Sequence, residues 1–284
     1  MTAPMTAPMT AYAELEDRFR SLEALQEAAG VLHWDMATMM PKGGAEARGE
    51  QLAALDVACH ERITAPELGD LLDAAEAEAE AGSDSLGPWQ RANLREMRRA
   101  WRHATALDAD LVAALAKASQ RSEMVWREAR PANDFKATLE PLGALLGLTR
   151  QAAAAKAAAF GCSPYEALLD QWEPGGRVAR IDPVFESYAD FLPDFLEQVL
   201  SRQAERGPRP RFPGPFPKAA QEVLGRRLMA AVGFDFEHGR LDVSLHPFCG
   251  GVPDDVRITT RYDEADFTSA LMAVLHETGH AMYE

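Results

Sequence analysis

Apolar residues recur at steps of three and four positions along most of this chain, which is the spacing of helices that bury one face. The first such stripe starts at Tyr12 and continues to Leu32. Proline and glycine divide the pattern that follows into further segments. We predict further helices from Ala45 past Leu55, over 65–80, from Pro88 onward, and over 108–130, 134–160, 182–206 and 218–232. The fold class is therefore expected to be mainly α.

The alternating pattern of strands occurs only near the end of the chain. Residues 240–245 and 256–262 alternate and are rich in β-branched side chains, and residues 246–255 between them are interpreted as a loop. We predict a small antiparallel sheet, followed by a helix that starts near Phe267. An edge strand of such a sheet could pair with an extended peptide through main-chain hydrogen bonds.

A proline-rich segment separates the two patterns. Five prolines fall within residues 207–217, which excludes regular helix and favours an extended connector. The chain opens on repeats of Met-Thr-Ala-Pro with little to bury, so residues 1–11 are expected to form a disordered tail. The predicted organisation is this tail, a helical region over 12–206, the connector over 207–217 and a second region over 218–284.

Composition limits the classes of function. The 284 residues are 47% hydrophobic, enough for a sizeable core, and the net charge of −15 argues against a nucleic-acid surface. Cys59, Cys162 and Cys249 are far apart without C-x-x-C spacing, so we expect reduced packing residues. Neither a membrane span nor a signal peptide is evident, and a cytoplasmic protein without membrane contact is the expectation.

The strongest chemical signal is the H-E-x-x-H motif at residues 276–280. Histidines four apart on a helix project from one face, so the imidazoles of His276 and His280 can reach a single metal ion. Glu277 would lie beside that ion, where its carboxylate can take a proton from water. We predict a zinc hydrolase in which both histidines are ligands and Glu277 is the catalytic base. The alternative is a partly exposed helix with two incidental histidines.

The third metal ligand is a separate question, because catalytic zinc normally takes three protein ligands. Glu284 would share the face of His280, but three successive ligands along one straight helix fit tetrahedral geometry poorly. We therefore expect the third ligand to lie beyond Glu284. His33, which precedes Trp34, is interpreted as a hydrogen-bonded core residue and not as a ligand.

Several motifs in order resemble the thermostable-carboxypeptidase family of metallocarboxypeptidases, family M32. They are His-Pro-Phe at 246–248, D-x-R-x-T at 255–259 and the H-E-x-x-H motif, with similar segments at 34–41 and 165–175. The resemblance implies a helical, peptidyl-dipeptidase-like (zincin) fold with a long groove, a homodimer, and one zinc ion that cobalt or manganese could replace. It also implies removal of C-terminal amino acids from peptides.

The same resemblance implies that His246, Asp255, Arg257 and Thr259 shape the closed end of the groove, near the substrate's C-terminus. An arginine suits that position, because a guanidinium pairs with a carboxylate through two parallel hydrogen bonds. Members of the family are considerably longer and take their third ligand, a glutamate, from a later helix. The chain thus resembles the N-terminal part of such an enzyme.

Two other functions are compatible with the sequence. A non-catalytic helical protein, such as a truncated product or an assembly scaffold, would hold no stoichiometric zinc and would cleave nothing. An oligopeptidase-type metallo-endopeptidase shares H-E-x-G-H and would cleave peptides with a blocked C-terminus. The D-x-R-x-T pattern argues against the endopeptidase.

Overall fold

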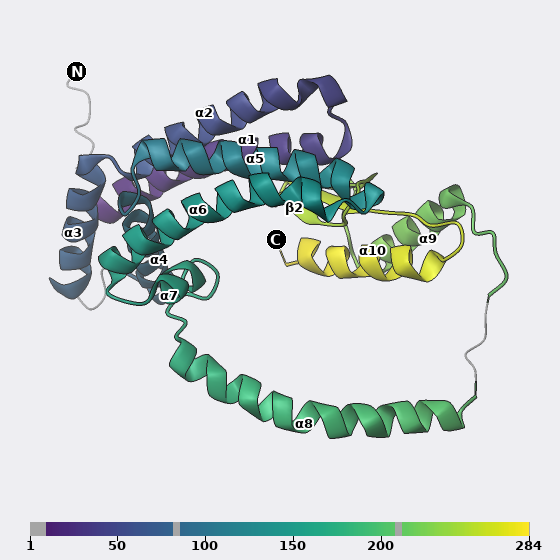
Figure 1. Cartoon of the computed structure of the whole chain (residues 1–284). Coiled ribbons are helices and arrows are strands. Elements are labelled where there is room, and N and C mark those ends of the chain that lie inside the picture. Colours follow the sequence, from purple (N-terminus) through teal and green to yellow (C-terminus); the bar gives the residue numbers. More distant parts are fainter. Residues whose placement is uncertain (1–9, 82–85, 208–211, 284) are drawn as a thin grey trace, which may run out of the picture.

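The computed structural model describes residues 10–81, 86–207 and 212–283, and within these ranges the protein is mainly helical (Figure 1), as predicted. Its helices are α1 (Ala11–Thr38), the 3-10 turn η1 (Lys42–Gly44), α2 (Ala45–Ile63), α3 (Pro66–Ala81), α4 (Pro88–Thr105), α5 (Ala109–Ala132), α6 (Phe135–Phe160), α7 (Pro164–Leu169), α8 (Val178–Glu205), α9 (Lys218–Ala231) and α10 (Phe267–Ala281). Helix α7 was not among the predicted helices.

Local hydrogen bonds explain several helix boundaries. Thr10, Asp108 and Asp134 each accept a hydrogen bond from the backbone N–H three residues later, the usual role of an N-cap side chain. Gly161 ends α6 with φ of 66°, a left-handed conformation that glycine adopts without a side-chain penalty. Ser163 and Glu166 form a capping box at the start of α7.

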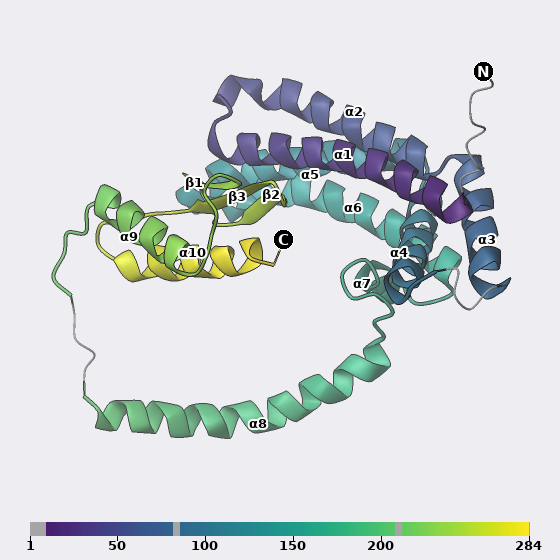
Figure 2. The same ribbon diagram turned by 180° about the vertical axis from the view of Figure 1, so that it is seen from behind.

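The long helices form one layer. Helices α1, α2, α5 and α6 pack in succession, α2 against both α1 and α5, and they lie side by side in both views (Figures 1 and 2). At one end of this layer, α1, α3 and α4 share a core. Its buried members are Tyr12, Leu15, Leu68, Leu72, Ala75, Ala79, Leu86 and Leu94.

The strands form a mixed sheet of order β1-β3-β2, made of β1 (Gly239–Val243), β2 (Cys249–Val252) and β3 (Asp255–Thr260). Strands β1 and β3 are parallel, whereas β2 and β3 are antiparallel. The predicted antiparallel pairing of the first and last strands is therefore wrong. Part of the predicted loop is strand β2, which forms a tight hairpin with β3. Strand β1 therefore pairs with the other edge of β3.

The sheet, α9 and α10 share a second core, in which strand β3 packs against α10 and α10 packs against α9. Its buried side chains are Met229, Phe234, Leu241, Val256, Ile258, Val274 and Ala281. Strand β2 contacts α1, so this C-terminal unit is docked on the helical layer.

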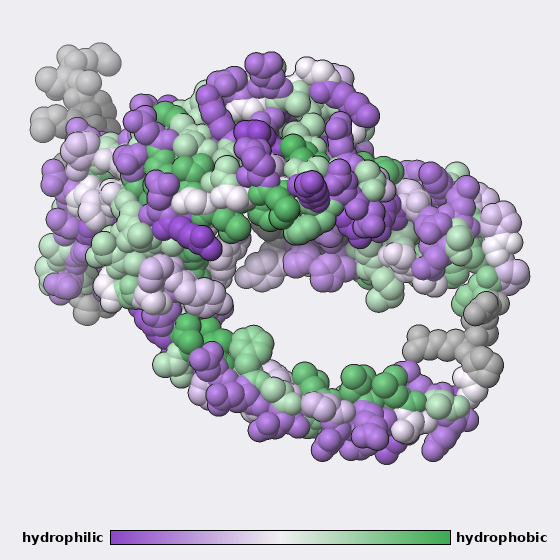
Figure 3. All heavy atoms as spheres, in the orientation of Figure 1, coloured by the Kyte–Doolittle hydropathy of each residue, from purple (hydrophilic) through white to green (hydrophobic). Residues whose placement is uncertain are grey.

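Helix α8 lies away from the other helices in both views (Figures 1 and 2), and none of its described residues is buried. Apolar spheres run along one side of it in Figure 3. The exposed large apolar residues are Val184, Phe185, Tyr188, Phe191, Leu192, Phe195, Leu196 and Leu200. The predicted helix is thus present, but its apolar stripe contacts no core in the described chain.

The predicted domain division stays a prediction. Residues 1–9 of the predicted tail and 208–211 of the connector lie outside the described residues, whereas Thr10 and Ala11 already belong to the cap and first turn of α1. The described ranges contain no helix with the length and apolar character that crossing a bilayer requires.

The core shared by α1, α3 and α4 should contribute strongly to stability. Leu72 is fully buried there, so Leu72→Ala should lower the free energy of unfolding by about 2–5 kcal/mol. Leu200→Ala on α8 removes the same atoms from a side chain that is 55% exposed. This change should alter the free energy of unfolding by less than about 0.5 kcal/mol. Urea unfolding followed by circular dichroism measures both, and equal losses would contradict this description of α8.

Candidate metal centre

Helix α10 presents two different faces. Asp266 caps its N-terminus by accepting a hydrogen bond from the Thr268 N–H at 2.9 Å. The buried residues Ala270, Val274, Thr278 and Ala281 follow helical spacing and form the face toward the sheet and α9. His276 and His280 are both exposed, because they fall on the other face of the same helix.

The two imidazoles lie side by side. Their Nε2 atoms are 3.2 Å apart, and the rings are 4.9 Å apart with an interplanar angle of 82°. Two nitrogen ligands at the usual Zn–N distance in a tetrahedral site lie about 3.3 Å from each other. The pair therefore already has the spacing that a shared ion would require.

Glu277 lies between the two faces and is 9% exposed. Among the described residues, no hydrogen bond or ion pair holds its carboxylate. A nearly buried carboxylate without a partner keeps its full capacity to accept protons or hydrogen bonds. It is therefore available as an acceptor on the helix that carries both histidines.

The described residues contain no group of three or more His, Cys, Asp or Glu side chains placed to hold a metal ion. The histidine pair nevertheless fits a divalent ion by donor type and by spacing. It supplies two of the ligands that such an ion requires. Glu284, weighed above as a third ligand, lies outside the described residues.

Asp255 and Arg257 form a bidentate ion pair on β3, with Nε–Oδ1 and Nη2–Oδ2 distances of 3.0 Å and 2.6 Å. The hydrogen bonds from Arg257 lower the pKa of Asp255, so the carboxylate stays ionised. Arg257 Nη1 has no partner among the described residues and forms the free edge of this pair.

Trp34 of α1 contacts two guanidinium groups from the sheet. Arg257 stacks on its ring at 4.2 Å and Arg240 at 4.8 Å, and Arg240 is itself held by Asp242 at 2.7 Å and 2.8 Å. This contact fixes the orientation of Arg257 from the helical layer. Sequence reasoning noticed Trp34 only as part of a family-like segment, because nothing local indicates a partner so distant in the chain.

Thr259 is fully buried and supports the loop that carries His246. Its Oγ1 accepts a hydrogen bond from the Phe248 N–H at 3.0 Å, and its own N–H donates to the Phe248 carbonyl at 2.9 Å. The Ser244 hydroxyl lies 2.8 Å from Thr259 Oγ1 and 2.6 Å from the His246 carbonyl. Thr259 can therefore act on a substrate only through the loop, whereas the His246 side chain is exposed.

The structure thus brings the predicted site residues together in two groups. His276, Glu277 and His280 form one, and the sheet residues form the other. No described hydrogen bond, ion pair or ring contact joins the two groups. His33 was predicted to be a core residue, but it is exposed, because it lies at the rim of a cavity between helices.

Comparisons with known proteins agree with these motifs. The family model for carboxypeptidase Taq (M32) metallopeptidases matches residues 14–284. Thermostable carboxypeptidase 1 from Thermus thermophilus is 37% identical over 98% of this chain and 55% of its own length, and its namesake from Pyrococcus furiosus is 30% identical over 94% and 52%. The chain thus spans about half the length of these curated relatives.

A solved structure shows the same architecture. Trypanosoma cruzi metallocarboxypeptidase 1 superposes with a TM-score of 0.82 at 42% identity, covering 96% of this chain and 54% of that one. The likeness thus covers the sequence as well as the fold.

Two adjacent threonines test the support of the loop. Thr259→Val should lower the free energy of unfolding by about 1–3 kcal/mol, because it leaves the partly buried Phe248 N–H without its side-chain partner. Thr260 is equally buried, but its hydroxyl has no partner among the described residues. Thr260→Val should therefore be neutral or stabilising. Chemical denaturation measures both, and an equal loss in the two variants would rule out the supporting role.

Proposed function

The chain belongs to the carboxypeptidase Taq (M32) metallopeptidase family, and on this basis we propose that it releases C-terminal amino acids from peptides with the help of a divalent metal ion. The observation that supports this most directly is the histidine pair of α10. Its two Nε2 atoms are 3.2 Å apart on an exposed face, next to a carboxylate that has no partner in the described chain.

His276 and His280 hold the ion through Nε2. Two imidazole donors favour zinc among biologically abundant ions, although cobalt or manganese could take its place. The bound ion supplies a Lewis acid that polarises the scissile carbonyl and lowers the pKa of the attacking water. Glu277 accepts the proton that this water loses and then delivers it to the leaving amine.

Arg257 binds the carboxylate at the substrate's C-terminus. Asp255 and Trp34 hold its guanidinium in one orientation, which leaves the Nη1 edge for the substrate. A free carboxylate is what distinguishes the last residue of a peptide from an internal one, so this contact directs cleavage to the end of the chain. His246 extends the same surface from the loop that Thr259 supports.

We also propose that the enzyme acts on peptides as a homodimer in the cytoplasm. The dimer is an expectation of family membership, and the exposed apolar side of α8 is the kind of surface that association covers. Free Cys59 and Cys162 suit a reducing compartment.

Metal binding tests the first step of this proposal. Dialysed against buffer that contains zinc, the chain should take up about one weakly held zinc ion, because the described residues supply only two of the usual three ligands, and His276→Ala should bind it at least about tenfold more weakly. His238→Ala is the matched control, because His238 is an exposed histidine paired with Asp235, outside the centre. Mass spectrometry of the metal content measures all three, and zinc that survives His276→Ala would disprove the assigned ligands.

Peptide hydrolysis tests the second step. The zinc-loaded chain should shorten a peptide with a free C-terminus and leave its amidated twin intact. Glu277→Gln should lower kcat by about 10²–10⁴-fold without loss of zinc, because the amide cannot take a proton. Liquid chromatography of released amino acids measures this. Internal cleavage of the amidated peptide would indicate an endopeptidase, and no cleavage by the zinc-loaded chain would indicate a non-catalytic protein.

A further inference from the structure

A cavity of about 600 Å³ lies among α1, α2, α4, α5 and α6, and it shares no lining residue with the candidate metal centre. Aliphatic side chains such as Leu22, Ile63 and Leu107 form part of its wall, and the side chains of His103 and Lys156 also line it. This volume is typical of sites for small molecules.

Lys156 is an unusual residue to find there. It is only 5% exposed, and no hydrogen bond or ion pair within the described chain holds its amine. Lysines are almost never buried to this degree without a partner. Burial lowers the pKa of Lys156, which shifts the amine toward its uncharged and nucleophilic form.

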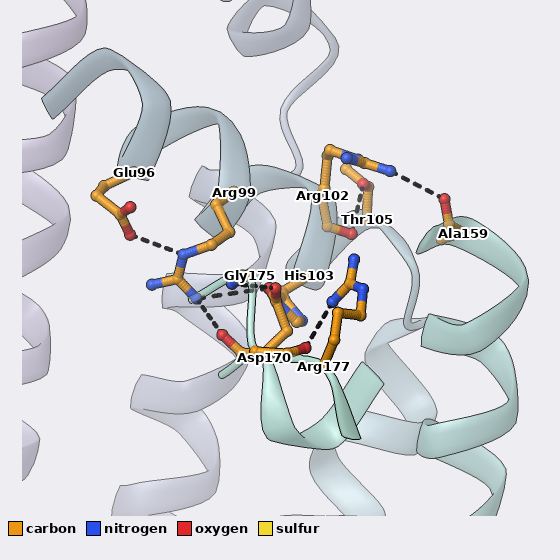
Figure 4. A network of polar contacts seen from close by, with 10 residues as sticks. Glu96, Arg99, Arg102, His103, Thr105, Ala159, Asp170, Gly175 and Arg177 are labelled. Atoms are coloured by element: carbon orange, nitrogen blue, oxygen red, sulfur yellow. Dashed lines mark hydrogen bonds and ion pairs between the residues drawn. The ribbon is translucent and has the colours of Figure 1, made fainter. Parts of the chain in front are cut away.

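His103 lines the same cavity, and one of its two ring nitrogens, Nε2, has a partner. Its Nε2 lies 2.8 Å from Asp170 Oδ2, and Asp170 also accepts hydrogen bonds from the Gly175 N–H and, at its carbonyl, from Arg99 (Figure 4). Burial opposes ionisation of Asp170, but the hydrogen bonds from His103 and Gly175 outweigh it and lower the pKa of the carboxyl.

The protonation state of His103 follows from this contact. Burial lowers the pKa of His103, so we assign a neutral ring whose Nε2–H donates to the ionised Asp170. Nδ1 then carries a bare lone pair, and it is buried without a partner among the described residues. The cavity thus combines a nucleophilic amine with an available base.

We propose that this cavity binds small aldehydes and that Lys156 captures them as a Schiff base. The lone pair of Nζ adds to the carbonyl carbon, the π electrons move to oxygen, and His103 Nδ1 relays the two protons of the amine, one after the other, from nitrogen to that oxygen. Loss of this oxygen as water leaves a C=N bond, so aldehyde and amine give imine and water without a redox partner.

Other residues of the wall favour an aldehyde over other ligands. Asp56 lines the same cavity, so a bound anion would meet a carboxylate, whereas a neutral aldehyde would not. Burial raises the pKa of the Cys59 thiol, which keeps this second nucleophile in its unreactive form.

Reductive labelling tests the proposal. The intact chain is treated with propionaldehyde and cyanoborohydride near neutral pH, and peptide mapping follows each lysine. Burial lowers the pKa of Lys156, so more of its amine is uncharged near neutral pH and it should react faster than the other lysines. These are Lys42, Lys117, Lys136 and Lys218. Labelling of Lys156 no faster than that of exposed Lys117 would overturn the proposal.

Three controls assign this rate to the cavity. Lys156→Met should remove the fast label and leave the other lysines unchanged. Ala104→Leu, which fills the cavity from α4 without altering the amine, should slow labelling of Lys156 alone. Repeating the reaction on the unaltered chain in concentrated urea should abolish the advantage, so the test does not depend on whether a variant folds. An advantage that persists in urea would disprove a folded site.

Discussion

The candidate centre depends on the burial of one face of α10. Val274 and Thr278 are almost completely buried, and Val274 belongs to the core that α10 shares with β3 and α9. With that face fixed, a residue two positions after Val274 must point outward, and so must the residue four positions further along. Helix geometry sets the spacing of the two imidazoles, and hydrophobic packing on the opposite side of the helix turns both of them outward.

A second constraint connects this unit to the rest of the protein. Trp34 is 7% exposed, and its two guanidinium neighbours, Arg240 and Arg257, come from β1 and β3. Both arginines are also held by aspartates of the same strands, so neither can leave the ring without breaking an ion pair. A side chain of α1 thereby orients the proposed carboxylate-binding arginine, and the helical layer takes part in the site without contributing a metal ligand.

How much of this the sequence predicts depends on how local the cause is. Helices were predicted because caps such as Asp108 and Gly161 act within one turn, and the histidine pair because four-residue spacing is a local property. The parallel direction of β1 and β3 was not predicted. It depends on the presence of strand β2 between them in the sequence, and the Gly250 and Gly251 of β2 give no apolar signal. The stack on Trp34 and the exposure of His33 depend on contacts between distant segments, which periodicity does not encode.

The described chain contains buried ionisable groups of two kinds, those with hydrogen-bond partners and those without. The carboxylate of Asp170 and Nε2 of His103 are buried as a hydrogen-bonded pair, and Arg48, largely covered, is held by Asp35, so these polar groups are satisfied. Glu277 and Lys156 are as well covered, yet neither has a partner in the described chain. An unpartnered buried ionisable group lowers stability, and natural sequences keep such groups mainly where reactivity compensates for that loss. The same reasoning that supports Glu277 as a base therefore supports Lys156 as a nucleophile, and the two groups belong to separate sites.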